Sequence, residues 1–247
     1  MNLCLGLGFK PYRRGDRGSA EGPSLNNDQI RLFEPLSVRK VLHATLIFRY
    51  VEMISLSENQ NKVPVPFEKS LYLLHPYNAT LVTCKGKNEE INVLAVAWII
   101  PVGVNPPLLA MSIRPERYSH DLIVETGEFV VNIPTFNMVK EVLLCGRRSG
   151  RNFEKFKKVS LSPQKARKVN VPVIKECVAH LECKLAKTVN IGDHTLIIGQ
   201  VVAAYAAEGC FEEVYDLTKF HPCLHLGKNF FTTCTEERVE PDIANIK

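Results

Sequence analysis

Residues 177–207, CVAHLECKLAKTVNIGDHTLIIGQVVAAYAA, contain two long strand-like segments joined by a turn at Gly192 and Asp193. Side chains alternate in the first segment, so one face has five apolar residues: Cys177, Ala179, Leu181, Cys183 and Leu185. The opposite face has His180, Glu182 and Lys184, and we expect His180 to face solvent. Residues 194–207 are apolar on both faces, which is typical of a strand in a closed barrel or beneath a partner subunit. The stretch therefore predicts two long strands of a β-rich domain, with both thiols in its core.

The segments before this stretch have the spacing of an antiparallel meander, because short β-rich runs alternate with turn residues. Strands are expected at residues 71–75, 79–84, 92–100, 108–113 and 128–133. A helix is expected over residues 120–125, with Ser119 as its N-cap and Gly127 just past its end. The fold class is therefore mainly β with a few short helices.

Two further segments lie between the meander and the long strands. Residues 138–144 predict a second helix, which ends at Cys145 and Gly146. The basic residues 147–158 are expected to form a loop that leads into a helical turn.

Composition limits the class of protein. The chain has 247 residues, 45% hydrophobic and 23% charged, so it can bury a sizeable core without disulfides or a structural metal. The net charge of +5 is modest, and no basic run is interleaved with aromatic residues. A nucleic-acid partner is therefore disfavoured, whereas a mild positive charge suits ligands that contain phosphate.

The sequence also lacks the signals of membrane insertion and secretion. No apolar run approaches the roughly 18–20 residues of a membrane span, and the most apolar stretch, residues 93–104, is interrupted by Pro101. The N-terminus has no basic residue ahead of its short apolar run, as a secretory signal would. We therefore expect a cytoplasmic protein with no membrane partner.

The cysteines and histidines do not form recognisable metal motifs. None of the eight cysteines belongs to a Cys-x-x-Cys pair, and without a secretory signal most are expected to be buried free thiols. His120, His221 and His225 lack ligand spacing with Cys or carboxylate residues, so no metal site is predicted.

Residues 1–52 differ from the rest of the chain. Much of this stretch is rich in Gly, Arg and Asp and has no apolar period, which indicates poor order. One hypothesis is that Met53 is the true start and that residues 1–52 come from an upstream start; the alternative is a loosely attached extension. Residues 53–247 are expected to form a single domain.

A collinear series of short motifs occupies the middle of the chain. The motifs are NVLAVAW at 92–98, NPP at 105–107, MSIRPERYSH at 111–120, EFVVNIP at 128–134, CGRRSG at 145–150, Lys155-Phe156, GDH at 192–194 and Gly199. In order and spacing this series resembles the flavin reductase-like family. The resemblance implies a split β-barrel that forms homodimers and binds FMN near the subunit interface.

The residues around the first expected helix suit the phosphate of FMN. Guanidinium groups, hydroxyls and the free N–H groups of a helix N-terminus together form a phosphate site. From the residues alone, solvated surface charges are the favoured interpretation of the arginines. The resemblance favours contact with flavin by Ser112, Arg114, Arg117, Tyr118, Ser119 and His120.

The first motif would line the flavin ring. Small side chains at Ala95 and Ala97 let a flat ring approach the backbone, although some family members have Ser or Thr in this strand. The alternative is an apolar strand with Trp98 in the core. The resemblance assigns ring contacts to Asn92, Val93, Leu94, Ala95, Val96, Ala97 and Trp98.

Two other motifs concern the nucleotide and the reaction. Arg147 and Ser149, in the loop GRRSGR, could contact FMN phosphate or a nicotinamide nucleotide, or the loop could simply be solvated. The resemblance associates Gly192-Asp193-His194 with the nicotinamide side of the flavin, where Asp193 would orient His194 next to a developing anion. The alternative is a turn aspartate before a strand histidine.

The function implied is a homodimeric FMN-dependent NAD(P)H:flavin oxidoreductase, which transfers hydride from NAD(P)H to flavin. No Rossmann fingerprint is present, so nicotinamide would bind in another way. An alternative is a flavoredoxin-like FMN electron carrier, reduced by a protein partner. A third is a split barrel that has lost its flavin and serves as an interaction module.

Overall fold

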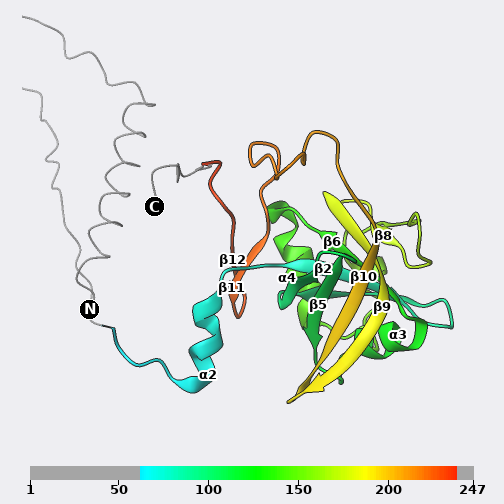
Figure 1. Cartoon of the computed structure of the whole chain (residues 1–247), viewed down its shortest axis with the longest axis horizontal. Helices are drawn as coiled ribbons and strands as arrows, with labels where there is room; N and C mark the ends of the chain where they lie inside the picture. The colour runs from blue at the N-terminus through cyan, green and yellow to red at the C-terminus, as the bar shows by residue number, and fades with distance from the viewer. Residues whose placement is uncertain (1–61, 238–247) are drawn as a thin grey trace, which may run out of the picture. The chain divides into compact units, whose positions relative to one another are not determined.

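The structure, a computed structural model, describes residues 62–237. The predictions for residues 1–52 and Met53 lie outside this range. The compact unit that contains every described helix and strand begins at Val65. Along the chain (Figure 1) it contains α2 (Phe67–Ser70), η1 (Leu71–Leu74), β1 (Tyr77–Asn78), β2 (Thr80–Lys85), β3 (Ile91–Val96), β4 (Ile99–Gly103), β5 (Leu108–Ile113), α3 (Tyr118–Thr126), β6 (Glu128–Ile133), η2 (Phe136–Met138), α4 (Val139–Arg147), α5 (Lys155–Lys158), β7 (Pro163–Gln164), β8 (Val173–Ile174), β9 (Ala179–Ile191), β10 (His194–Ala206), β11 (Leu224–Gly227) and β12 (Phe230–Thr232).

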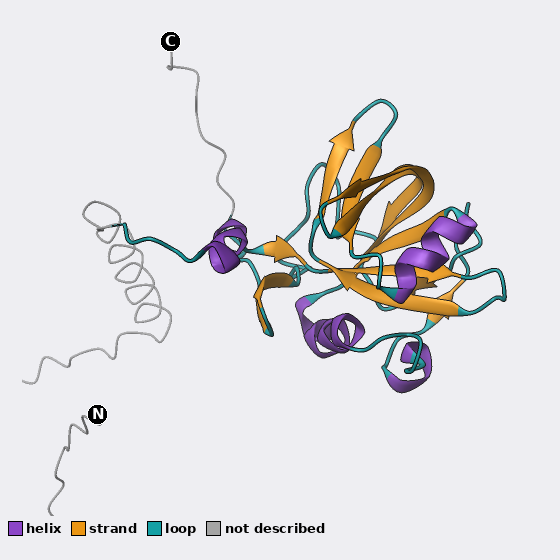
Figure 2. Ribbon diagram, turned by 90° about the horizontal axis from the view of Figure 1, so that it is seen from below, coloured by secondary structure: helices purple, strands orange, loops and turns teal. Residues whose placement is uncertain are grey.

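One seven-stranded antiparallel sheet, in the order β3-β2-β6-β9-β10-β5-β4, forms the body of the domain. Its two outer strands, β3 and β4, are consecutive in the chain, joined only by Ala97 and Trp98. Three Cα–Cα steps span at most about 11 Å, whereas a flat sheet of seven strands would separate its outer strands by about 29 Å. The sheet must therefore curl into a barrel that is open only beside this crossing, as the curved sheet in Figure 2 shows.

Alternation along the strands divides the buried residues into two layers. Leu94 and Val96 of β3 face the barrel interior, which is filled by side chains such as Phe129 and Met111. Val93 and the partly buried Ala95 point to the other face of the same strand, where α4 packs. Helix α4 therefore covers β3 from outside the barrel.

The prediction that His180 faces solvent is wrong, and of the three residues on that face only Lys184 is exposed. His180 is only 8% exposed and Glu182 is fully buried. The His180 Nδ1 lies 2.9 Å from Asn132 Oδ1, and the backbone N–H groups of Arg167, Lys168 and Val169 donate to Glu182. The reason is that residues 166–173 fold over this face of the sheet and form a separate apolar cluster there.

Glu182→Gln is expected to lower the free energy of unfolding by about 2–4 kcal/mol, because an amide cannot satisfy all the donors that now point at a carboxylate. Burial alone would raise the pKa of Glu182, but the three backbone N–H groups and the Tyr205 hydroxyl outweigh it and lower the pKa. A lowered folded-state pKa stabilises the fold above the unfolded value of roughly 4.3, and this stabilisation disappears as the pH falls through the folded pKa.

Urea denaturation at neutral and acidic pH measures both effects. The matched control is Glu128→Gln, because half-buried Glu128 accepts a single backbone N–H, that of Asn170, from the same segment. Its loss should stay below about 1 kcal/mol. Equal losses in the two variants at neutral pH would contradict the assigned role of Glu182.

The remaining element predictions are mostly confirmed. The strands expected at 79–84, 108–113 and 128–133 and both helices are present, and Gly127 ends α3 in the left-handed conformation, with φ 72°. The segment 71–75 is a 3₁₀ helix instead of a strand, and 92–100 is divided into β3 and β4. Ser119 is not the N-cap of α3; that position is Arg117, and Ser119 is buried inside the first turn.

The thiols behave as expected. Cys177 and Cys183 are buried, and within residues 62–237 every cysteine is free and five of the seven are buried. Over the same residues, no helix combines the length and hydropathy needed to cross a membrane, and no cluster of three or more potential metal ligands occurs.

Candidate functional site

A groove of about 290 Å³ opens where β3 crosses to β4. Residues from β3, the crossing, β5 and the start of β10 line it, with contributions from α4 and β11. The lining residues are Leu94, Ala95, Val96, Ala97, Trp98, Ser112, Ile113, Arg114, Arg117, Gly146, His194 and His225. Nine of these twelve are predicted site residues, and the fold brings them together from three separate segments of the chain.

The crossing itself presents backbone and a flat ring to the groove. A Cβ on Gly146 would lie 3.3 Å from the Ala95 Cβ, so the end of α4 approaches the strand closely and small side chains are needed. Trp98 is 40% exposed, so the alternative that places it in the core is wrong. Its ring centroid lies 5.2 Å from that of His194.

A polar chain extends along one wall of the groove. Strand pairing aligns Thr195 with Ile113, which brings the Gly192-Asp193-His194 turn next to Arg114. One Asp193 oxygen lies 2.8 Å from the Arg114 guanidinium, and the other lies 2.7 Å from His194 Nδ1. The hydrogen bond from His194, followed by the charge of Arg114, lowers the pKa of Asp193. Asp193 is therefore an anion that orients His194.

Arg117 differs from Arg114. It is exposed at the N-cap of α3, and within residues 62–237 its guanidinium has no carboxylate partner. The first N–H groups of a helix also lack intrahelical acceptors. Arg117 and the start of α3 are thus free to bind an anion.

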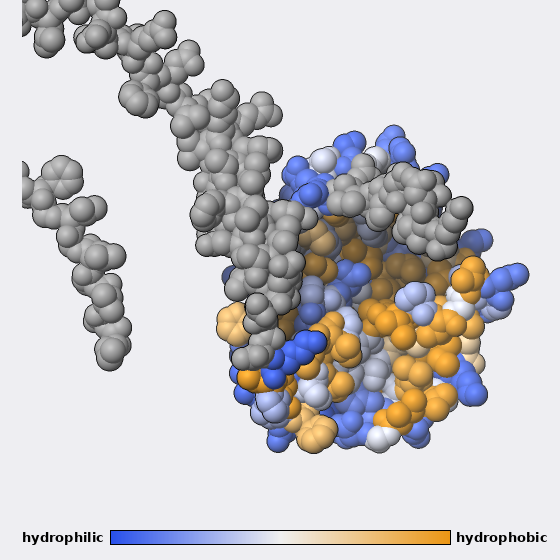
Figure 3. Space-filling view, turned by 60° about the vertical axis from the view of Figure 1, so that its left-hand side comes forward, coloured by the Kyte–Doolittle hydropathy of each residue, from blue (hydrophilic) through white to orange (hydrophobic). Residues whose placement is uncertain are grey.

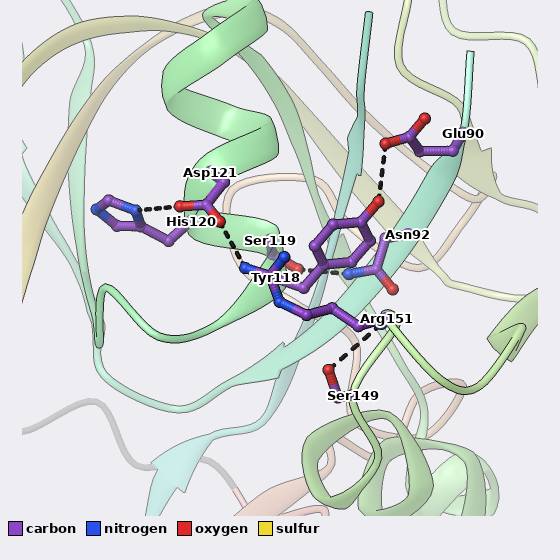
Figure 4. A network of polar contacts seen from close by, with 8 residues as sticks. All are labelled: Glu90, Asn92, Tyr118, Ser119, His120, Asp121, Ser149 and Arg151. Carbon is purple, nitrogen blue, oxygen red and sulfur yellow. Dashed lines mark hydrogen bonds and ion pairs between the residues drawn. The ribbon is translucent and has the colours of Figure 1, made fainter. Parts of the chain in front are cut away.

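Four other predicted residues support the groove from behind it. The Asn92 amide donates to the buried Ser119 hydroxyl over 2.8 Å, and Val93 is fully buried against α4. The Tyr118 hydroxyl donates to Glu90 over 2.7 Å. These contacts fix the start of β3 to the first turn of α3 (Figure 4).

His120 and Ser149 belong to a network at the surface of α3. His120 Nε2 lies 3.1 Å from the Thr195 hydroxyl. Arg151 pairs with Asp121 over 2.6 Å and lies above the Tyr118 ring, while its backbone N–H donates to Ser149 (Figure 4). The network attaches the basic loop to α3, and neither His120 nor Ser149 lines the groove.

Arg147 lines an adjoining lobe of about 160 Å³, which shares Ala95, Val96, Ala97, Gly146 and His225 with the groove. Its guanidinium donates to Lys228 O and Asn229 Oδ1, both 2.6 Å from Nη2, so it holds the turn between β11 and β12. The sequence did not identify His225, Lys228 or Phe231 as lining residues. Strand pairing of β1 with β11, far apart in sequence, brings them here.

Cys145, which precedes the lining residue Gly146, is buried. Cys145 is fully buried at the end of α4, and burial raises the pKa of its thiol to about 11. A packing role, as expected from the sequence, fits this environment.

Comparison with known families decides what kind of domain this is. A family model described as flavin reductase like domain matches residues 72–233. The chain belongs to this family.

Relatives of this flavin reductase-like domain occur in archaea and bacteria. An uncharacterized protein from Archaeoglobus fulgidus is 42% identical over 154 residues, covering 62% of this chain and 86% of the relative. A flavin reductase (NADH) from Kitasatospora aureofaciens is 32% identical over 134 residues, covering 52% and 65%.

Solved structures agree with the family. An FMN-binding protein from Thermus thermophilus, with bound 1-cyclohex-2-enone, is 26% identical with a TM-score of 0.62, covering 74% of this chain and 99% of that one. A flavoredoxin from Methanosarcina acetivorans is 26% identical with a TM-score of 0.65, covering 75% and 97%. The predicted family and the predicted split-barrel fold, mainly β with few short helices, are confirmed.

Proposed function

We propose that this flavin reductase-like domain is a cytoplasmic, homodimeric, FMN-dependent NAD(P)H:flavin oxidoreductase. The observation that supports this most is the convergence of Trp98, Arg114, Arg117 and the Asp193–His194 pair on one groove. The relative named flavin reductase (NADH) supports nicotinamide as the hydride donor.

The groove suits FMN in three respects. Arg117 and the start of α3 would hold the phosphate, which needs a cation and free N–H groups. Ala95, Ala97 and Gly146 leave a wall without bulky side chains, against which a flat ring can lie. The volume, with the adjoining lobe, is in the range of small-molecule sites. Bound FMN would supply the ring that accepts the hydride.

The protein would supply orientation and charge. When His194 Nδ1 donates to Asp193, its Nε2 is the nitrogen left to interact with a ligand. A proton held at Nε2 would stabilise negative charge that develops in the groove. Arg114, bound to the other oxygen of Asp193, fixes the position of the pair.

The apolar surface supports the proposed homodimer. Strand β4 is an edge strand on which Ile100, Val102 and the following Val104 are exposed. Apolar side chains also gather in patches on the face shown in Figure 3. Exposed apolar residues on an edge strand are unusual for a monomer and typical of a surface that another chain covers.

FMN-loaded protein mixed anaerobically with NADH or NADPH in a stopped-flow instrument is expected to lose its oxidised-flavin absorbance with at least one donor. Trp98 is the only tryptophan of the chain, so quenching of its fluorescence during FMN titration shows that flavin occupies this groove. The FMN-loaded protein should sediment as a dimer.

His194→Gln is the matched variant. It should still bind FMN but accept hydride at least about tenfold more slowly, since it removes a positioned proton donor. Failure of both donors on FMN-loaded protein would contradict the reductase. Reduction by a protein donor would then support the carrier function, which the similarity to a flavoredoxin favours.

A further inference from the structure

Lys155 is a buried cation between the two elements that form one wall of the groove. It begins α5, yet it is only 4% exposed. Its ammonium donates to Val93 O of β3 over 2.6 Å and to Cys145 O of α4 over 2.8 Å. A single side chain thus joins the strand that would line the flavin ring to the end of the helix packed against it.

The charge of Lys155 is not neutralised by an acid. Within residues 62–237, Lys155 forms no ion pair, and burial lowers its pKa. Its other neighbours are thiols: burial raises the pKa of Cys84 to about 12 and of Cys145 to about 11, so neither is an anion at neutral pH. A buried charge without a counter-charge is costly, and two carbonyl dipoles offset that cost only in part.

Lys155 also lies close to the start of α3. Its ammonium donates to Val93 O, and the preceding residue, Asn92, donates to Ser119 in the first turn of that helix. A cation held here would attract an anion bound at the start of α3. The effect of Lys155 on such an anion would act through space, because its own donors are directed at the backbone.

We propose that Lys155 is a positioning and specificity residue that makes the groove select a phosphorylated flavin over an uncharged one. The proposal rests on the proposed FMN site and adds the discrimination between FMN and riboflavin. If Lys155 only supported the structure of the groove, its loss would lower the affinity for both ligands equally, since they share the same ring. A buried charge, in contrast, acts on the phosphate alone.

Three substitutions at this position separate charge from hydrogen bonding. Lys155→Arg keeps both, Lys155→Gln keeps a donor without charge, and Lys155→Met keeps neither. The matched control is Lys158→Met, which removes the same charge from an exposed position on the same helix.

Titration of each variant with FMN and with riboflavin, followed by Trp98 fluorescence, gives the ratio of the two affinities. We expect the preference for FMN to fall about tenfold in Lys155→Gln and Lys155→Met and to persist in Lys155→Arg and Lys158→Met. If Lys155→Met does not fold, the comparison of Lys155→Gln with Lys155→Arg still tests the proposal.

The outcomes separate this proposal from the function. Wild-type protein that binds FMN, with a Lys155→Gln variant whose preference is unchanged, would overturn the role of Lys155 alone. Equal losses of affinity for both flavins would show that Lys155 only supports the structure of the groove, and they would also overturn its proposed role in specificity. Wild-type protein that binds neither flavin would overturn the FMN site, and the role of Lys155 with it.

Discussion

Replacing Gly199 with valine is expected to lower the free energy of unfolding by about 3 kcal/mol, because the barrel interior has no room for the added atoms. A Cβ at this position of β10 would lie 2.8 Å from Phe129 Cε1 and closer still to Cζ. The Phe129 ring is fully buried among the interior side chains and cannot move aside. Urea or thermal denaturation measures the loss.

A double-mutant cycle with Phe129→Leu identifies the cause. Shortening Phe129 costs stability by itself, but it should remove much of the penalty of the valine, so the two losses should add to more than the loss in the double variant. Strictly additive losses would show that the clash with Phe129 is not the source of the destabilisation.

The alternation of polar and apolar residues predicted where strands lie better than it predicted which of their side chains are buried. The alternation of residues 177–185 identified β9 correctly, and it correctly predicted that Cys183 in the strand and Cys177 just before it are buried. It failed for His180 and Glu182 because residues 166–173 cover that face, and strand periodicity contains no information about a covering loop. A buried polar side chain in a sheet becomes recognisable only through its partners, which here come from a different segment.

Local composition also gave wrong secondary-structure predictions where tertiary contacts determine the structure. The apolar run at 71–75 has the composition of a strand but has no sheet partner. It forms η1, and Tyr72 packs where Gly227 lacks a side chain. The division of 92–100 at Ala97 and Trp98 follows from closure of the barrel, which no window of nine residues can reveal.

The site was predictable where its residues are contiguous. Arg114, Arg117 and the Asp193–His194 turn lie within short motifs, and β5–β10 pairing brings those motifs together. Lys155 was recognised only as part of a motif, since its burial depends on the packing of α4 against β3. His225 and Phe231 depend on a β-hairpin attached by the distant strand β1, so no local signal could have identified them.

Replacing Arg117 with glutamate is expected to weaken FMN binding roughly 100-fold while changing riboflavin binding by less than about threefold. Hydrogen bonds to charged groups contribute about 1.5–3 kcal/mol, and reversing the charge adds repulsion. The exposed side chain has no described carboxylate partner, so the fold should tolerate the change. Equilibrium titration with each flavin, followed by Trp98 fluorescence, measures the two affinities.

Lys140→Glu is the matched control, because it reverses the same charge on an exposed residue in the first turn of α4, outside the groove. It should leave both flavin affinities within about twofold of the wild type, since exposed charges are screened by salt. Equal losses for FMN and riboflavin in Arg117→Glu would indicate a distorted groove. Unchanged FMN binding would place the phosphate elsewhere, and the lobe next to Arg147 and Lys228, which has two cations and no lining carboxylate, would then be the site to test.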